Sequence, residues 1–266
     1  MAEREVDLID SHCHLDVVVE RGIPVAEVVA RGHEAGVHQI VTSGDDLGES
    51  RAGCALAEEF REIYFTVGWH PSNPAPPSPE ELAEMRQLLA HPKALAVGEV
   101  GLDYFFRPGH RETPQAVQRE MFASMLELAA ELDKPVVIHQ RQAHADLLKL
   151  LDAAPSVLGI LHCFSGDRAF AEQAADRGLY CSFAGNVTFK SALELQDAAR
   201  VVPAELLLVE TDAPFLAPEP QRGRSSQPAM VRATAQWLAV LRGDCLESLS
   251  AVTSENARRA LRMPPA

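Results

Sequence analysis

The stretch VDLIDSHCHLD (residues 6–16) joins a short apolar run to two histidines, His12 and His14, that lie two positions apart. The apolar run is typical of a strand in a parallel sheet, which helices cover on both faces. Side chains alternate along an extended chain, so both imidazoles can point the same way. No GxGxxG motif or phosphate-binding loop follows this strand, which weakens the alternative of a doubly wound open sheet.

Seven further apolar runs follow along the chain, and amphipathic stretches separate them. They cover residues 37–43, 63–68, 94–99, 135–139, 158–162, 179–184 and 206–211. The clearest helix is expected over 114–132 with Thr113 as its N-cap, another should start near Ser78, and helices from about Ser226 should close the fold. Eight strands alternating with helices predict an α/β fold, a (β/α)8 TIM barrel, with residues 1–266 as a single domain.

Composition and charge restrict the kinds of protein that this chain can be. No apolar run is long enough to span a bilayer, so no membrane association is expected. The five cysteines form no CxxC motif, which favours free thiols in a reducing cytoplasmic setting. The net charge of -14 argues against a protein that grips duplex DNA through a broad basic face, but it allows a nucleic acid end to enter a locally positive site. No obligatory protein partner is evident.

Polar residues gather at the predicted strand ends, where a barrel of this kind carries its active site. Six candidate metal ligands follow five strands: His12, His14, Glu99, His139, His162 and Asp212. Each alone has an ordinary explanation, since a histidine at a strand end is often a hydrogen-bonded structural group and a carboxylate can cap a helix. Their convergence on one mouth favours a metal site, because burying charge without a partner is costly.

Six ligands exceed what one ion takes in an open catalytic site, where about three leave room for water. We therefore expect two divalent metal ions with Glu99 as the bridge between them. One ion would be held by His12, His14, Glu99 and Asp212, and the other by Glu99, His139 and His162. Mixed imidazole and carboxylate ligation suits zinc, manganese, cobalt or iron and tolerates magnesium less well, so the identity of the ion stays open.

Short polar motifs mark most of the predicted strand ends. They are DSHCHLD, GWHP, GEVGLDY, VIHQR, HCFSG and ETDAPFL, with SENARRAL near the C-terminus. Together and in this order they resemble the TatD family of metal-dependent deoxyribonucleases, which belongs to the amidohydrolase-like barrels. The resemblance matches all six ligands and implies that His70, in GWHP, contacts substrate. Two departures are RSSQP at 224–228, where the family has Asn-Glu-Pro after a basic stretch, and Gln140, where a cysteine is usual.

The expected activity is divalent-metal-dependent hydrolysis of phosphodiester bonds in DNA by a water that two ions activate. The resemblance implies single-stranded DNA degraded from the 3′ end. Asp212 is the expected general base and Glu99 the second catalytic residue. The expected substrate-binding residues are His70, Arg141, Arg222 and Arg224, although the arginines could instead be solvated surface groups. Trp69, Tyr104 and Phe105 could stack on an unpaired base or simply pack under a loop.

Two other functions remain open at this point. The same metal site could hydrolyse another ester or an amide, for example an aminoacyl-tRNA or a small-molecule ester, because a fold does not determine its substrate. A metal-binding protein without turnover belongs to a different class, and Asp212 beside five other ligands counts against it.

Overall fold

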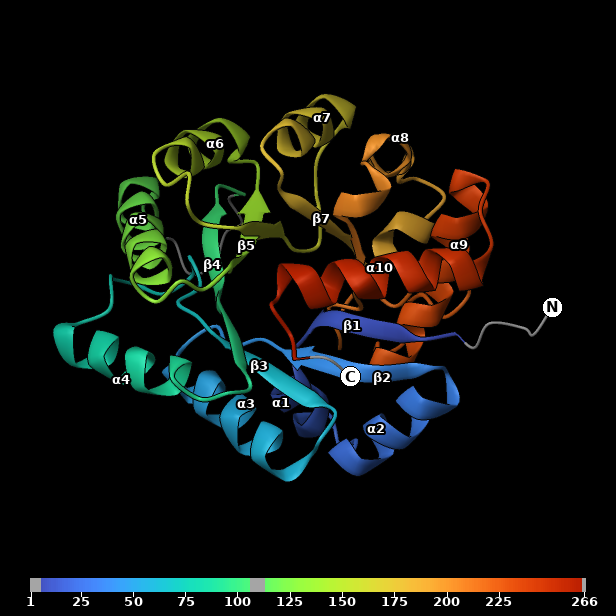
Figure 1. Ribbon diagram of the computed structural model, residues 1–266, viewed down its shortest axis with the longest axis horizontal. Helices are drawn as coiled ribbons and strands as arrows, with labels where there is room; N and C mark the ends of the chain where they lie inside the picture. The colour runs from blue at the N-terminus through green and yellow to red at the C-terminus, as the bar shows by residue number, and fades with distance from the viewer. Residues whose placement is uncertain (1–5, 106–112, 265–266) are drawn as a thin grey trace.

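The computed structural model describes residues 6–105 and 113–264, and eight parallel strands form one sheet in the order β1 to β8. The strands are β1 Leu8–Cys13, β2 Val37–Thr42, β3 Ile63–Val67, β4 Ala94–Asp103, β5 Val136–Arg141, β6 Gly159–Leu161, β7 Tyr180–Phe183 and β8 Leu207–Val209. Beyond β8, Asp212 N donates to His12 O at 3.0 Å and His14 N to Ala213 O at 2.6 Å. The sheet thus curves round to meet itself (Figure 1), and the predicted (β/α)8 barrel is confirmed.

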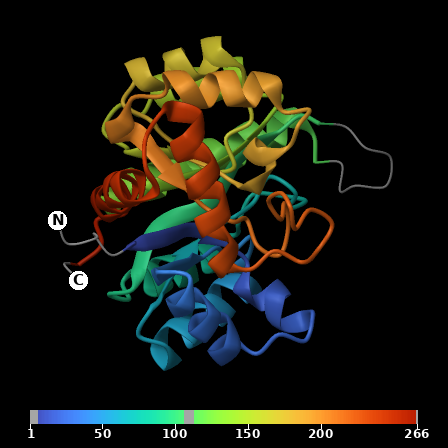
Figure 2. The ribbon, with the colours of Figure 1, turned by 90° about the vertical axis from the view of Figure 1, so that its right-hand side faces the viewer.

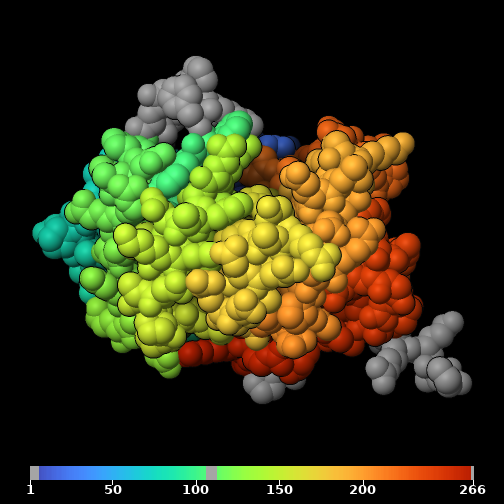
Figure 3. All heavy atoms as spheres, turned by 90° about the horizontal axis from the view of Figure 1, so that it is seen from above, coloured from blue at the N-terminus to red at the C-terminus, as the bar shows by residue number. Residues whose placement is uncertain are grey.

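Helices surround the strands, and those of the second half cover the side seen in Figure 3. The helices are α1 Leu15–Glu20, α2 Val25–Glu34, α3 Leu47–Glu59, α4 Pro79–Leu89, α5 Gln115–Glu131, α6 His144–Asp152, α7 Arg168–Asp176, α8 Leu193–Val201, α9 Val231–Arg242 and α10 Leu246–Ala260, with short 3-10 turns η1 Gly185–Thr188, η2 Ala204–Leu206 and η3 Pro228–Met230. Among the described residues, no helix combines the length and the apolar character that crossing a bilayer requires.

Two local expectations about helix starts had different outcomes. The start of α4 is as predicted, because the Ser78 hydroxyl accepts from Glu81 N and the Glu81 carboxylate accepts from Ser78 N in a capping box. The predicted cap of α5 was wrong. Pro114 occupies the N-cap position, and the Thr113 hydroxyl donates instead to the carbonyl of Asn73 at 2.8 Å. A tertiary contact has taken the side chain that a local pattern assigned to the cap.

The two ends of the barrel differ in chemistry. At the N-terminal ends of the strands, inward-facing side chains such as Ile9, Val41 and Ile160 pack against Ala257 and Leu261 from the region of α10. This helix lies across the front of the barrel in Figure 1 and on the left in Figure 2. The predicted C-terminal helices therefore do close the barrel, and they close it with apolar contacts at this end. The opposite end, where the strands finish, is left for polar side chains.

The prediction that Glu99 ends its strand was wrong. β4 continues to Asp103, because Gly101, Leu102 and Asp103 pair with residues of β5 beyond a register shift. Glu99 therefore lies inside the strand. Its side chain rises from the wall of the barrel and is only 3% exposed.

Candidate metal centre

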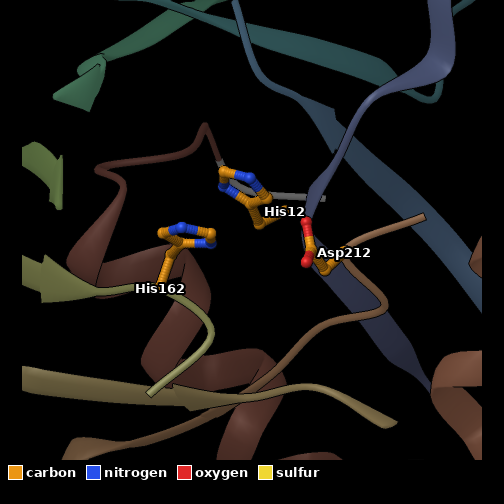
Figure 4. A group of neighbouring side chains, drawn as sticks. All are labelled: His12, His162 and Asp212. Atoms are coloured by element: carbon orange, nitrogen blue, oxygen red, sulfur yellow. The ribbon is translucent and has the colours of Figure 1, made fainter. Parts of the chain in front are cut away.

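All six predicted ligands come together at the C-terminal end of the barrel. His12 and His139 lie on β1 and β5, His14 and His162 directly follow β1 and β6, and Asp212 lies beyond β8. Figure 4 shows the side chains of His12, His162 and Asp212 pointing toward one another from three parts of the wall. The His12 and His162 rings stack with centroids 4.0 Å apart. These six residues are called the histidine–carboxylate cluster below.

The Glu99 carboxylate lies between two groups of histidines. Its Oε2 is 3.2 Å from His12 Nε2 and 3.7 Å from His14 Nε2. Its Oε1 is 2.6 Å from His139 Nδ1 and 2.9 Å from His162 Nε2. Each carboxylate oxygen therefore has its own pair of imidazoles, and the Glu99 carboxylate lies between the two pairs.

The spacing of the imidazole nitrogens fits ligands that share an ion. Two nitrogens bound at 2.0–2.1 Å with a tetrahedral angle between them would lie about 3.3 Å apart. His12 Nε2 and His14 Nε2 are 3.3 Å apart, and His139 Nδ1 and His162 Nε2 are also 3.3 Å apart. Asp212 Oδ1 lies 3.5 Å from His14 Nε2 and so adds a carboxylate to the first pair. Both halves of the cluster thus offer nitrogen and oxygen donors that suit a divalent metal.

Among residues 6–105 and 113–264, three carboxylates outside the cluster face the far nitrogens of its histidines. Asp103 Oδ2 is 3.4 Å from His139 Nε2, Glu210 Oε1 is 3.4 Å from His162 Nδ1, and Asp45 Oδ1 is 4.0 Å from His14 Nδ1. Carboxylates in this position orient metal-binding imidazoles and increase their basicity. None of the three was predicted from the sequence. Asp103 lies four residues after Glu99, and Glu210 lies two residues before Asp212. Residues separated by an even number of positions along an extended strand share a face, so this spacing could have identified Asp103 and Glu210 from the sequence.

The carboxylates make the cluster attract positive charge. Burial alone would lower the pKa of His14, but Asp45, Asp212 and Glu99 outweigh burial and raise that pKa to about 10. Burial is likewise outweighed at His139, whose pKa rises to about 9 because of Asp103 and Glu99. Protons occupy these imidazoles when no metal does, so metal binding should release protons.

His70, expected as a substrate contact, lies within reach of the cluster. Its Nε2 is 3.5 Å from Glu99 Oε1, its ring meets that of His139 edge-on at 4.6 Å, and its Nδ1 is 2.8 Å from the Ser72 hydroxyl. Burial, followed by the charge of His139, lowers the pKa of His70 to about 3. His70 is therefore a neutral imidazole beside the second histidine pair.

The three predicted arginines lie at different distances from the mouth. Arg141 ends β5, lies over the Phe105 ring at 4.0 Å, and lines a cavity of about 740 Å³. That cavity also contacts Ser165, Asn186 and Leu193, and α6 and α8 flank it, yellow-green and orange in Figure 3.

The other two arginines have their contacts away from the six ligands. Arg222 is exposed and lies over the Phe189 ring at 4.2 Å. Arg224 is exposed in a separate hollow with Arg31 and Gln227, and the described residues that line this hollow include none of the six ligands.

Two of the aromatic side chains that were candidates for base stacking, Trp69 and Tyr104, make hydrogen bonds to other parts of the protein. Trp69 is buried and its Nε1 donates to the carbonyl of Ala75 at 2.8 Å, which supports the packing alternative. The Tyr104 hydroxyl donates to Asp146 at 2.8 Å. Phe215, which the sequence analysis did not single out, is 45% exposed and its ring lies 6.0 Å from that of His14.

Comparison with known proteins agrees with this geometry. Residues 9–262 match the TatD related DNase family. The uncharacterized metal-dependent hydrolase YcfH of Escherichia coli (strain K12) is 41% identical over 95% of this chain and 94% of its own length. The 3'-5' ssDNA/RNA exonuclease TatD of Cronobacter sakazakii is 37% identical over 88% of this chain and 90% of its own length.

A solved structure shows the same architecture. The crystal structure of the TatD homolog YJJV from Escherichia coli superposes with a TM-score of 0.87 at 27% identity, over 97% of this chain and 98% of that one. The candidate ligand groups and these relatives together identify a metal-dependent hydrolase that acts on ester bonds. The chain belongs to the TatD related DNase family.

Proposed function

We propose that this hydrolase removes nucleotides from the 3′ end of single-stranded DNA, with two divalent ions held in the histidine–carboxylate cluster. The observation that carries the proposal is the Glu99 carboxylate, whose two oxygens face two separate histidine pairs. The family match and the relative named a 3'-5' ssDNA/RNA exonuclease support a nucleic acid substrate. Hydrolysis of another ester or amide at the same site is the alternative.

The proposed ligands divide into two sets. His12, His14 and Asp212 would hold one ion, His139 and His162 the other, and Glu99 would bridge them. Zinc, manganese and magnesium are all candidates, with the imidazole-rich donor set favouring zinc or manganese. Bound ions would lower the pKa of a water and offset negative charge on the phosphate oxygens.

Asp212 is the proposed general base. Burial disfavours its charged form, but the hydrogen bond from His14 and the charges of His162 and His14 hold the pKa of Asp212 below its usual value. Its side chain is 13% exposed at the mouth, so it can reach a water there and accept a proton. Glu99, at 3% exposed, is too enclosed for that role and positions the ligands instead.

Substrate binding depends on contacts at the mouth, because long-range attraction is weak. Two divalent ions would offset only four of the 14 net negative charges. His70 beside the second histidine pair and Arg141 at the 740 Å³ cavity are the proposed contacts near the reacting phosphate. Arg222 and Arg224 are proposed to contact phosphates farther along the strand.

A free strand end should be required for hydrolysis. The mouth of a barrel is concave, so a phosphate must enter it to reach the cluster. A duplex is about 20 Å across, and even its major groove admits little more than one helix, so the phosphates of a duplex would not reach the floor of the mouth. Metal-loaded protein should shorten linear single-stranded DNA in single-nucleotide steps and leave a circle of the same sequence and a linear duplex largely intact. Gel analysis of the three substrates, with label at either end of the linear strand, measures both the requirement and the direction.

Equal rates on the circle and the linear strand would show internal cleavage and contradict the requirement for an end. Activity on small esters with none on any of the three DNA substrates would favour the alternative function. The metal-dependent hydrolase assignment would stand in either case.

Loss of Glu99 should reduce metal content more than loss of His14. A bridging carboxylate serves both ions, whereas His14 serves one. Elemental analysis should find close to two ions per chain in the wild type, about one in His14→Ala and fewer than one in Glu99→Ala. Glu84→Ala, which removes a partly exposed carboxylate on α4 that pairs with Arg51, is the matched control and should keep both ions.

Glu99→Gln keeps the side-chain volume and reports on the bridge if Glu99→Ala folds poorly by circular dichroism. Two ions per chain in folded Glu99→Gln and Glu99→Ala would mean that Glu99 does not bridge.

A further inference from the structure

An exposed aromatic ring stands beside the histidine–carboxylate cluster. Phe215 lies three residues beyond Asp212, in the loop that follows β8, orange on the right of Figure 2. Its ring centroid is 6.0 Å from that of His14, at an interplanar angle of 70°. At 45% exposed, it presents a large apolar surface next to a highly polar site. The ring is therefore accessible to a ligand that enters the mouth.

Several contacts hold the Phe215 ring in place. Its backbone N–H donates to the carbonyl of Asp212 at 2.8 Å, which ties the ring to the proposed base. The Arg21 guanidinium lies over the ring at 5.4 Å and also donates to the Pro214 carbonyl at 3.4 Å and the Ser225 hydroxyl at 3.3 Å. These contacts hold the ring in place before any ligand arrives, so little ordering is needed on binding.

We propose that Phe215 is the platform on which the base of the terminal nucleotide stacks, an inference that rests on the proposed function. The Phe215 ring lies next to His14, with the two ring centroids 6.0 Å apart, so a base that stacks on Phe215 would belong to a nucleotide next to the cluster. The other candidate rings are less suited. Trp69 is buried, and the Arg141 guanidinium lies over the Phe105 ring at 4.0 Å, closer than the 5.4 Å between Arg21 and the Phe215 ring.

Stacking on Phe215 also accounts for selection of single strands. An internal base of a duplex already stacks on both neighbours and is paired, so it would have to be unstacked before it could contact the ring. A base at an unpaired end has a free face. Every base has such a face, so the contact should tolerate any sequence. Phe215 is therefore a positioning residue that selects for an unpaired end without reading the base.

The test combines a change in the ring with a change in the substrate. Stacking of one base on an aromatic ring changes affinity by about 5- to 150-fold. Phe215→Leu should raise KM for a single-stranded oligonucleotide by about that factor with little change in kcat, and Phe215→Trp should restore it. Val240→Ala, which trims an exposed apolar side chain on α9, should leave KM unchanged.

An oligonucleotide that lacks only its 3′-terminal base provides the coupling measurement. In the wild type, it should show the same rise in KM that Phe215→Leu causes with the normal substrate. In Phe215→Leu, removal of the base should cause no further rise, because the contact is already gone. Full additivity of the two changes would overturn the proposal.

A binding measurement removes the dependence on turnover. An oligonucleotide with a phosphorothioate at its last linkage and 2-aminopurine as its terminal base should lose fluorescence on binding to metal-loaded wild type or Phe215→Trp, because stacking quenches this base. Binding to Phe215→Leu should leave it bright, and equal quenching there would overturn the proposal. If the wild type shortens DNA and Phe215→Leu has the same KM, the stacking role of Phe215 is refuted and the proposed function stands. If the wild type never shortens DNA, both the proposed function and the stacking role are refuted.

Discussion

Protein stripped of divalent metal should lose all measurable hydrolysis of single-stranded DNA and recover it when manganese or zinc is added. The reason lies in the cluster itself. Four histidines and two carboxylates meet at the mouth. Of these residues, Glu99 is enclosed, and His14 and His139 carry protons when no metal is bound. In that state neither imidazole can accept a proton from water, and no bound ion lowers the pKa of that water.

The measurement uses chelated and dialysed protein whose metal content is checked by elemental analysis. Initial rates on a labelled single strand are then compared before and after titration with each metal. A parallel sample that is chelated and immediately reloaded controls for damage during the treatment. Full activity in protein verified to hold no metal would contradict the prediction and would move the chemistry away from the cluster.

Addition of metal to the stripped protein should also release protons, which can be measured without any substrate turnover. Because the pKa of His14 is raised to about 10 and that of His139 to about 9, both imidazoles are protonated at neutral pH without metal. Ligands must be deprotonated to bind, so addition of metal should release protons into a weakly buffered solution. A cluster that binds no metal would release none, which separates loss of binding from loss of catalysis.

Much of the fold and of the cluster could be predicted from the sequence. Near-continuous apolar runs mark buried parallel strands, and their alternation with helical patterns leaves few arrangements of the chain. In a barrel, residues at successive strand ends meet at one mouth whatever their separation along the chain. His12 and Asp212, 200 positions apart, could therefore be assigned to one site, and the backbone bond from Asp212 N to His12 O at 3.0 Å joins those two positions.

Local patterns failed where a distant contact decides the conformation. The apolar run of β4 is interrupted by Glu99 and Gly101, so the strand was expected to end at Glu99, but pairing with β5 continues it to Asp103. Thr113 has the residue type of a helix cap, but the Asn73 carbonyl takes its hydroxyl. Neither partner lies within the sequence window that such patterns use.

The positions of the loop side chains also required the fold. Arg141 at the end of β5 and Arg224 in the loop beyond β8 are the same residue type, but one lines a cavity beside β5 and the other a hollow with Arg31 on α2. Asp45 follows β2 without a distinguishing motif, and only the closed barrel shows its carboxylate 4.0 Å from His14. Strand ends are placed by the architecture, whereas long side chains on loops are placed by the packing around them.

Replacement of the proposed base should have the second large effect. Asp212→Asn should lower kcat on single-stranded DNA by about 10²- to 10⁴-fold, the usual contribution of a positioned base. Metal content should fall much less, because the amide keeps the size of the side chain and one oxygen that can contact an ion. The backbone bond from residue 212 to the His12 carbonyl does not involve the side chain and should remain. The measurement is kcat together with elemental analysis of the same preparation.

Two further Asp→Asn variants show whether the loss belongs to position 212. Asp103→Asn changes the carboxylate that supports His139 from behind, at 3.4 Å, and should cost about 10- to 100-fold in metal affinity or activity. Asp197→Asn, on the exposed surface of α8, should behave like the wild type. The expected order of kcat is therefore Asp197→Asn first, Asp103→Asn next and Asp212→Asn last.

Turnover close to that of the wild type in metal-loaded Asp212→Asn would place the base elsewhere, and His70 is the group that the geometry then offers. Its Nε2 lies 3.5 Å from Glu99 Oε1, and its lowered pKa, about 3, leaves the imidazole neutral and free to accept a proton. However, the same burial and the neighbouring charge of His139 that keep it neutral would destabilise the imidazolium formed by the transfer. A carboxylate loses charge when it accepts a proton, whereas an imidazole gains charge beside other cationic groups. Asp212 is therefore the better acceptor here, and combining His70→Ala with Asp212→Asn should lower kcat only modestly below Asp212→Asn alone.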